Sequence, residues 1–188
     1  MDWKFTSEKD LANTFNNTID PFWEEQVSRG HSAGKGDVDV HYAWCIPDTP
    51  RSTIVISSGR IESYLKYKEL VFDLYQNGFA VFILDHRGQG LSGRMTHDPQ
   101  HGYVAHFDDY VDDLVYFTQN IVVPKQQGRL QLLCHSMGGA IGALTLLRLP
   151  TLFSKAVLAS PMFGIKPALP NWLANSLITA GLAVNKLR

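Results

Sequence analysis

A serine at position 136 stands in the pattern of this chain that most clearly points to chemistry. An apolar run, residues 130–133, comes shortly before it, and Gly138 and Gly139 follow it closely. This order predicts a strand, a tight turn that carries the serine, and a helix, which is the layout of a nucleophile elbow. A serine held outward on such a turn can attack a carbonyl carbon and form an acyl intermediate. The alternative is a turn between a strand and a helix that has no chemistry.

One position departs from the usual G-x-S-x-G form of this turn. The residue two places before the serine is Cys134, where glycine is usual. Cysteine is small and is often buried, so a strand and a helix can still approach each other closely at this point.

Acyl transfer also needs N–H donors for the negative charge that develops on the carbonyl oxygen. The N–H of Met137 is expected to be free, because Met137 begins the predicted helix. A second N–H is expected from the loop after an early predicted strand, where Gly59 and Arg60 stand. Glycine at position 59 would let the backbone come close to a ligand.

The elements that must position these groups alternate between strands and helices. The predicted strands are residues 38–44, 53–56, 79–84, 130–134 and 155–160, and the predicted helices are residues 64–77, 108–120 and 137–149. Such alternation indicates an α/β fold with a mostly parallel sheet and flanking helices. The strand at residues 38–44 is expected to be half-exposed. Residues 1–30 are expected to be helical or irregular, with Phe22 and Trp23 docked on the core.

Other polar residues near the serine are interpreted as structural. Asp85 and His86 are adjacent at a strand end and point to opposite faces, so they cannot both reach Ser136. Arg87 is expected to fix the loop that follows them. His135 also points away from the serine by strand alternation, and we interpret it as a packed core histidine.

No metal and no organic cofactor is expected. His97, His101 and His106 lie in a predicted loop at spacings that fit no helical pair of ligands. The two cysteines, Cys45 and Cys134, fall in predicted strands and are expected to be buried free thiols.

The composition fits one globular domain with a core. The chain has 188 residues, of which 45% are hydrophobic and 19% charged, and its net charge is −1. Without a run of Lys or Arg, a nucleic-acid partner is not expected. The sequence shows no secretory signal and no apolar stretch of about 20 residues. A cytoplasmic location is therefore expected, with peripheral membrane contact left open.

The last part of the chain changes character. Pro167 and Pro170 interrupt the pattern, and an apolar helical face follows them. This face suits either another core helix or the beginning of a lid over an acyl chain. We therefore divide the chain into residues 1–161, the N-terminal part of an α/β core, and residues 162–188, the start of a lid or cap.

Four motifs in this order resemble α/β-hydrolases of the monoacylglycerol-lipase type, and among them bacterial lysophospholipases of the L-two type. The motifs are residues 59–64, 85–90, 108–114 and 135–139, and residues 161–165 extend the likeness. The resemblance runs from about Trp23 to the chain end. It implies the α/β-hydrolase fold and hydrolysis of an ester in a lysophospholipid or a monoacylglycerol. For a bacterial enzyme of this kind, the peripheral contact would be with the inner membrane.

The resemblance also implies roles for individual residues. Ser136 would be the nucleophile, and the backbone N–H groups of Arg60 and Met137 would be the oxyanion donors. Gly59 and Ile61 are assigned to substrate binding.

Phe163 is assigned to substrate binding as well. Ser58 stands where the family commonly has histidine, which would weaken the support of the oxyanion loop.

The acid and the base of the triad do not map onto this chain. In α/β-hydrolases they follow the serine in the order Asp or Glu, then His, and residues 137–188 contain none of these three residue types. We therefore expect an N-terminal portion of a longer hydrolase whose sheet stops before the last strands. Such a portion should be inactive alone and should self-associate through its unpaired edge.

Two alternatives stay open. One is another hydrolase on the same fold, acting on a peptide, an epoxide or a small ester, because fold alone does not choose the substrate. The other is a non-catalytic acyl-binding or regulatory module that kept the pocket and lost the base.

Overall fold

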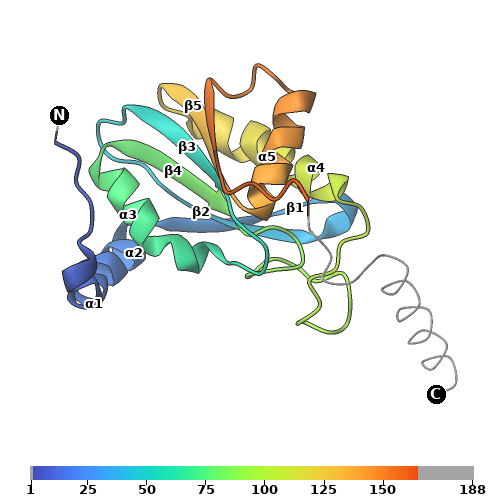
Figure 1. The fold of residues 1–188 in the computed structure, drawn as a ribbon, viewed down its shortest axis with the longest axis horizontal. Coiled ribbons are helices and arrows are strands. Elements are labelled where there is room, and N and C mark those ends of the chain that lie inside the picture. The colour runs from blue at the N-terminus through green and yellow to red at the C-terminus, as the bar shows by residue number, and fades with distance from the viewer. Residues whose placement is uncertain (1, 165–188) are drawn as a thin grey trace, which may run out of the picture.

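The computed structural model describes residues 2–164, and its centre is a twisted sheet (Figure 1). The six strands lie in the order β1-β2-β4-β3-β5-β6. Their bounds are β1 (Ser28–Ala33), β2 (Asp39–Cys45), β3 (Ser52–Ser57), β4 (Phe79–Leu84), β5 (Arg129–His135) and β6 (Lys155–Ala159). The strands β4, β3, β5 and β6 are parallel to one another, while β2 is antiparallel to both β1 and β4.

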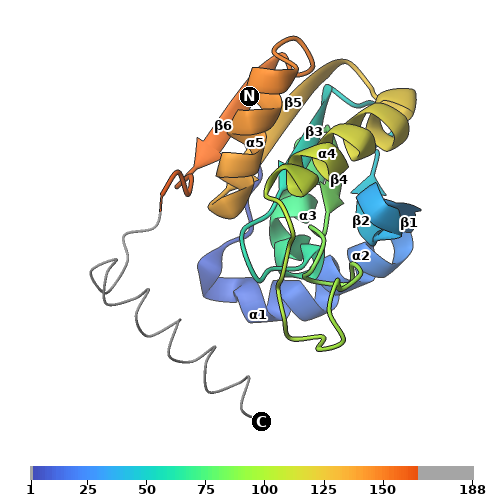
Figure 2. The ribbon, with the colours of Figure 1, turned by 90° about the vertical axis from the view of Figure 1, so that its right-hand side faces the viewer.

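Helices cover both faces of this sheet (Figure 2). The α-helices are α1 (Leu11–Thr14), α2 (Asp20–Gln26), α3 (Lys68–Gln76), α4 (Asp108–Phe117) and α5 (Met137–Arg148). A 3-10 turn at Tyr64–Tyr67 leads into α3, and π-helical turns at Phe15–Ile19 and Thr118–Val122 precede α2 and follow α4. The helices α4 and α5 pack on one face, and α2 and α3 pack on the other.

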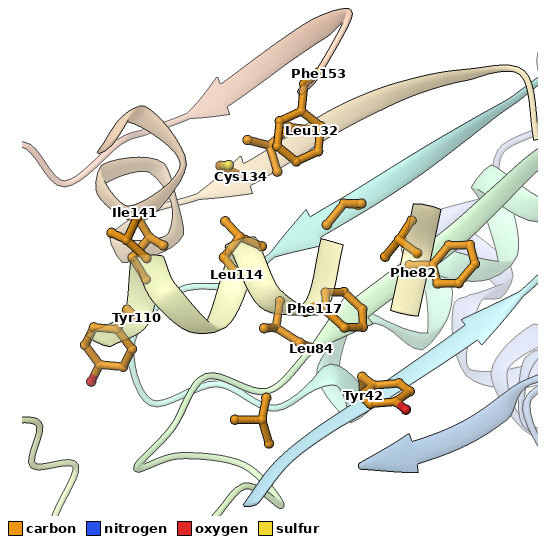
Figure 3. Packing of buried hydrophobic residues seen from close by; sticks show 14 of the residues in the cluster. Tyr42, Phe82, Leu84, Tyr110, Leu114, Phe117, Leu132, Cys134, Ile141 and Phe153 are labelled. Carbon is orange, nitrogen blue, oxygen red and sulfur yellow. The ribbon is translucent and has the colours of Figure 1, made fainter. Parts of the chain in front are cut away.

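The core consists of two apolar clusters separated by the sheet. Strand β4 contributes to both, because Phe82 and Leu84 face α4 and α5 while Val81 and Ile83 face α2 and α3. Figure 3 shows the first cluster, in which Phe117 of α4 lies among residues of β2 and β4. A strand buried on both faces must be apolar throughout, which is why β4 reads as one continuous apolar run.

The elements predicted from residue 38 onward are confirmed, but two expectations about the first part of the sheet are wrong. Residues 1–30 were expected to be helical or irregular, yet β1 begins at Ser28. Strand β1 was not predicted, because Ser28–Ala33 has almost no apolar side chain; this strand exists by pairing with β2. The expectation that β2 is half-exposed is wrong near its end. There Ala43 and Cys45 are buried under α2 and α3, while Val40 and Tyr42 are buried on the opposite face.

Other expectations about burial are confirmed. Phe22 and Trp23 of α2 are docked on the core, and Cys45 and Cys134 are buried free cysteines. Within residues 2–164, no helix has the length and apolarity needed to cross a membrane. The assignment of residues 162–188 to a lid falls almost entirely outside the described residues.

A buried ion pair fastens the loop after β4 to helix α4. The Arg87 guanidinium donates from Nε to Oδ2 of Asp113 and from Nη2 to Oδ1, both at 2.6 Å. Both side chains are buried. Arg87 also donates to the carbonyl oxygen of Lys35 at 3.1 Å. The interpretation of Arg87 as the residue that fixes this loop is confirmed.

Replacing Asp113 with Asn should lower the free energy of unfolding by about 3 kcal/mol, because the buried Arg87 charge loses its closest partner and keeps only the contact with Asp109 at 3.7 Å. Urea denaturation measures this loss. Asp112→Asn on the same helix is the matched control. Asp112 pairs with Lys35 and Arg148 at the surface, where an ion pair contributes about 0–1 kcal/mol. Equal losses in the two variants would contradict the structural role of the buried pair.

Candidate active site

The backbone of Ser136 is strained in the way that a nucleophile elbow requires. Its φ is 51° and its ψ is −116°, between the end of β5 and the start of α5. A positive φ is uncommon outside glycine, and such strained backbone costs about 1–3 kcal/mol. Ser136 N–H donates to the carbonyl oxygen of Ala159 at 3.1 Å, and Met162 N–H donates to the Ser136 carbonyl oxygen at 2.9 Å. These bonds on both sides of the residue hold the bend in place.

Glycines let helix α5 lie directly against the strand ends. A Cβ on Gly138 would be only 2.1 Å from the carbonyl oxygen of Ser57. A Cβ on Gly142 would be 2.4 Å from Sγ of Cys134. Cys134 therefore fits at a position where glycine is usual because the facing helix residue, Gly142, has no side chain.

Three groups that could serve acyl transfer have no partner within residues 2–164. The Ser136 hydroxyl is half-buried and accepts or donates no hydrogen bond there. Met137 is the first residue of α5, so its N–H has no acceptor within the helix. The N–H of Arg60 donates to no acceptor in the same part of the chain. The loop of Arg60 lies against the start of α5, since Ser58 O is 2.5 Å from where a Gly138 Cβ would be.

Residues 58–63, which we call the oxyanion loop, are held from one side by Glu62. Its Oε2 accepts hydrogen bonds from Gly59 N–H at 2.7 Å and from the Tyr67 hydroxyl at 2.5 Å, and its Oε1 pairs with Lys66. Burial acts to raise the pKa of Glu62, but the bonds from Lys66, Tyr67 and Gly59 outweigh it and lower the pKa to about 2. The carboxylate is therefore charged at neutral pH.

The same loop is held from the other side by the side-chain amide of Gln89. Its Nε2 donates to the Gly59 carbonyl oxygen at 2.8 Å, and its Oε1 accepts from Ile61 N–H at 2.9 Å. Sequence reasoning found neither Gln89 nor Glu62. Glu62 lies only three residues from Gly59, so their contact could have been inferred from the local sequence. Gln89 lies on a different loop, 30 residues away, and the sequence near Gly59 does not indicate it.

Asp85 and His86 serve the framework, as interpreted from the sequence. Asp85 is buried and accepts hydrogen bonds from the backbone N–H groups of Tyr64 and Leu91 and from the Ser63 hydroxyl. Burial raises its pKa, although these hydrogen bonds oppose the change.

His86 is fully buried behind the elbow. Its Nε2 lies 3.0 Å from the Ser57 hydroxyl, and its ring meets Tyr110 edge-on. Burial penalises the imidazolium and lowers the pKa of His86 to about 4. His86 is therefore neutral at physiological pH and is bonded to Ser57 on the neighbouring strand.

His135 is not the packed core histidine that we expected. Its side chain is 46% exposed, and its Nδ1 lies 3.5 Å from Oε2 of Glu62 and 3.5 Å from the Tyr67 hydroxyl. Residues of α3 and of the end of β5 line the space around it, so α3 does not cover the end of β5 on this face. His135 instead lines a groove of about 470 Å³ with Leu70, Leu133 and other residues.

The histidines of the long loop lie at the surface. His101 pairs with Asp98 at 3.3 Å, and both side chains are exposed. Among residues 2–164 there is no group of three His, Cys, Asp or Glu side chains placed to hold a metal ion.

The structure places the expected substrate-binding residues near the elbow, but their role stays a prediction. Gly59 is buried in the oxyanion loop, and Ile61 on the same loop is 75% exposed. Phe163 is 68% exposed and follows Met162, the residue bonded to the Ser136 carbonyl.

The strand order and the serine bend together define a class of protein. A mostly parallel sheet ordered β1-β2-β4-β3-β5-β6, with a strained serine between β5 and α5, is the α/β-hydrolase arrangement. The family model described as serine aminopeptidase, S33, matches residues 48–188. The chain therefore belongs to this family of α/β hydrolases.

Relatives of known name cover most of this chain but only part of their own length. Lysophospholipase L2 of Escherichia coli is 41% identical over 177 residues, which are 94% of this chain and 52% of that protein. Monoglyceride lipase of Rattus norvegicus is 33% identical over 124 residues, 66% of this chain and 39% of that protein. The chain spans about half the length of the curated relatives it matches.

Solved structures share the fold. The crystal structure of epoxide hydrolase VrEH1 from Vigna radiata matches with a TM-score of 0.60 at 19% identity, covering 81% of this chain and 46% of that chain. At this identity the likeness concerns the fold alone.

Replacing Gly138 with Ala should destabilise the protein by several kcal/mol, because the added methyl group would collide with two backbone carbonyls that cannot move aside. Thermal or urea unfolding measures the loss. Gly102→Ala is the matched control, since a Cβ there would be 3.8 Å from its nearest neighbour. A Gly138→Ala protein as stable as the control would show that α5 is not held against the strand ends.

The burial of His86 makes stability fall at acid pH. Its pKa is about 4 in the folded chain against 6.5 for a free side chain, so below pH 6.5 the unfolded chain binds a proton that the folded chain does not. The free energy of unfolding should fall by about 1.4 kcal/mol per pH unit between pH 6.5 and 4 from this group.

Urea denaturation between pH 7.5 and pH 4.5 checks this slope. The His86→Gln protein should lose that part of the slope, whereas a His97→Gln control, changed at an exposed loop histidine, should keep it. An unchanged slope in His86→Gln would contradict the prediction.

Proposed function

We propose that this chain carries the nucleophile and the oxyanion hole of a serine carboxylic-ester hydrolase acting on a single-acyl glycerolipid, a lysophospholipid or a monoacylglycerol. The observation that carries the proposal is the strained Ser136, whose hydroxyl is free next to the Met137 N–H, while the loop that carries the unpaired Arg60 N–H lies against the start of α5. The similarity to lysophospholipase L2 and monoglyceride lipase supports the substrate class.

In the proposed reaction, Oγ of Ser136 attacks the ester carbonyl carbon and forms a tetrahedral intermediate. The negative oxygen accepts hydrogen bonds from the N–H groups of Met137 and Arg60. Losing one such donor lowers kcat by a factor on the order of 10²–10³. The C–O bond to the glycerol breaks, the glycerol oxygen takes up a proton, and water then hydrolyses the acyl-enzyme.

The base that takes the serine proton is not among residues 137–188, which lack His, Asp and Glu. His86 and His135 do not supply it, because one is bonded to Ser57 and the other lies beside Glu62. We therefore propose that the acid and the base come from a polypeptide segment outside this sequence, and that this chain alone is inactive.

Further proposals concern the surroundings of the site. Gly59 would let the oxyanion loop approach the ester, and Ile61 and Phe163 would contact the substrate. Residues 162–188 would begin a lid, and the active protein would work in the cytoplasm with peripheral contact at a membrane. The edge strand β6, where Val157 is 59% exposed, would pair with another copy of the chain when nothing covers it.

A chimera tests the function. All 188 residues of this chain are joined to the part of E. coli lysophospholipase L2 that follows the matched segment, and hydrolysis of lysophosphatidylethanolamine and of monoacylglycerol is measured. We expect turnover in the chimera and none in the 188-residue chain. Ser136→Ala should abolish turnover, because losing the serine costs on the order of 10⁶ in kcat in a well-studied serine hydrolase.

Ser28→Ala is the matched control, because Ser28 is an exposed serine on β1. Its turnover should equal that of the unchanged chimera. Turnover that survives Ser136→Ala would contradict the proposal. A folded chimera that binds lipid, does not turn it over and does not react with a fluorophosphonate at Ser136 would favour the non-catalytic acyl-binding module.

A further inference from the structure

A polar pocket lies on the side of the oxyanion loop that faces the loop after β4. Its volume is about 460 Å³. Residues of both loops and of α4 line it, among them Arg60, Gln89, Arg94, Gln100 and Tyr110. Arg60 belongs both to this pocket, through its side chain, and to the proposed oxyanion hole, through its backbone N–H.

Two guanidinium groups in this pocket have no carboxylate partner within residues 2–164. Arg60 is exposed and forms no ion pair there. Arg94 donates to three backbone carbonyl oxygens, those of Gly90 at 3.0 Å, of Pro99 at 2.8 Å and of Ser92. A guanidinium has five N–H donors, so Arg94 keeps donors for a ligand while its position is fixed.

The nearby carboxylates are already satisfied by other groups. Glu62 is the only acid among the residues lining the pocket, and its oxygens accept from Lys66, Tyr67 and Gly59. Asp85, next to Gly90, is buried, and its carboxylate already accepts three hydrogen bonds. The charge that the pocket presents to a ligand is therefore positive.

Tyr110 adds a donor that has no partner within residues 2–164. The residue is 4% exposed, and its hydroxyl forms no hydrogen bond within the described part of the chain. Figure 3 shows this hydroxyl pointing away from the apolar cluster that holds the ring. Tyr110 is one of the residues that line the pocket, and we assign its free hydroxyl to the pocket as a hydrogen-bond donor.

We infer that this pocket binds the phosphodiester of a lysophospholipid headgroup. The inference rests on the proposed function, and it selects lysophospholipid over monoacylglycerol. Guanidinium groups match phosphate oxygens with paired, charge-assisted hydrogen bonds, whereas a neutral glycerol would leave both arginines unpaired. In a lysophospholipid the phosphate is joined to the ester through the short glycerol unit. The ester carbonyl at the Arg60 N–H and the phosphate at the Arg60 side chain are therefore compatible.

Binding to the 188-residue chain tests the inference without requiring catalysis. Calorimetric titrations use glycerophosphoethanolamine, which has the phosphodiester without an acyl chain, and compare it with inorganic phosphate and with glycerol. Glycerophosphoethanolamine should bind most tightly and glycerol at least tenfold more weakly. Arg60→Gln keeps the backbone N–H and should weaken phosphodiester binding about tenfold, as for a lost hydrogen bond to a charged group.

Arg129→Gln is the matched control, because Arg129 is an exposed arginine at the start of β5, and it should bind the phosphodiester as the unchanged chain does. Arg94→Gln should also weaken phosphodiester binding. Because Arg94 also holds its own loop, the unfolding midpoint of this variant is measured to show that its fold is unchanged. The inference would be overturned if glycerol bound as tightly as the phosphodiester, or if inorganic phosphate bound more tightly. It would also be overturned if Arg60→Gln had no effect or if Arg129→Gln caused an equal loss.

The chimera separates this inference from the proposed function. Hydrolysis that depends on Ser136 but does not favour lysophospholipid over monoacylglycerol would overturn the headgroup pocket and leave the esterase proposal standing. If Ser136→Ala leaves turnover unchanged while phosphodiester binding still depends on Arg60, the esterase proposal is overturned. The pocket would then bind a phosphodiester, but not as the headgroup of a substrate of Ser136.

Discussion

The left-handed backbone of Ser136 is the constraint on which the other features of this protein depend. Such a conformation is unfavourable by itself and persists only where its surroundings leave no alternative. Here the start of α5 lies in contact with the carbonyl groups of Ser57 and Ser58, and no side chain larger than glycine fits at position 138. The close approach of strand and helix both creates the bend and places the Met137 N–H beside the hydroxyl.

The oxyanion loop separates two charge environments. On one side Glu62 is neutralised by Lys66 and hydrogen-bonded to the Gly59 N–H. On the other side the guanidinium groups of Arg60 and Arg94 have no acid to balance them in the part of the chain that the structure describes. The loop is thus fixed by an internal anion while its outer side stays cationic, so the groups that hold its shape do not compete with an anionic ligand.

The sequence was informative where one element buries a continuous or periodic apolar face, and less so elsewhere. Strand β4 and the nucleophile bend were predictable because their residue types are dictated locally. Strand β1 was not predictable, because Ser28–Ala33 is held by backbone hydrogen bonds to β2. Backbone pairing of this kind leaves no pattern in the side chains. Gln89 and the exposure of His135 depend on contacts between loops and on how far α3 reaches, which no local pattern encodes.

The hydrogen bonds around Ser136 also bear on the order in which the molecule is assembled on the ribosome. The amide and carbonyl of the serine are fastened to Ala159 and Met162, at and beyond the end of β6. Until that stretch has emerged and joined the sheet, the bend lacks the bonds that hold it. Because synthesis runs from the N-terminus onward, Ser136 is made before the residues that fasten it. The bend therefore acquires its full set of bonds only after strands β1 to β5 and residues 159–162 have been made.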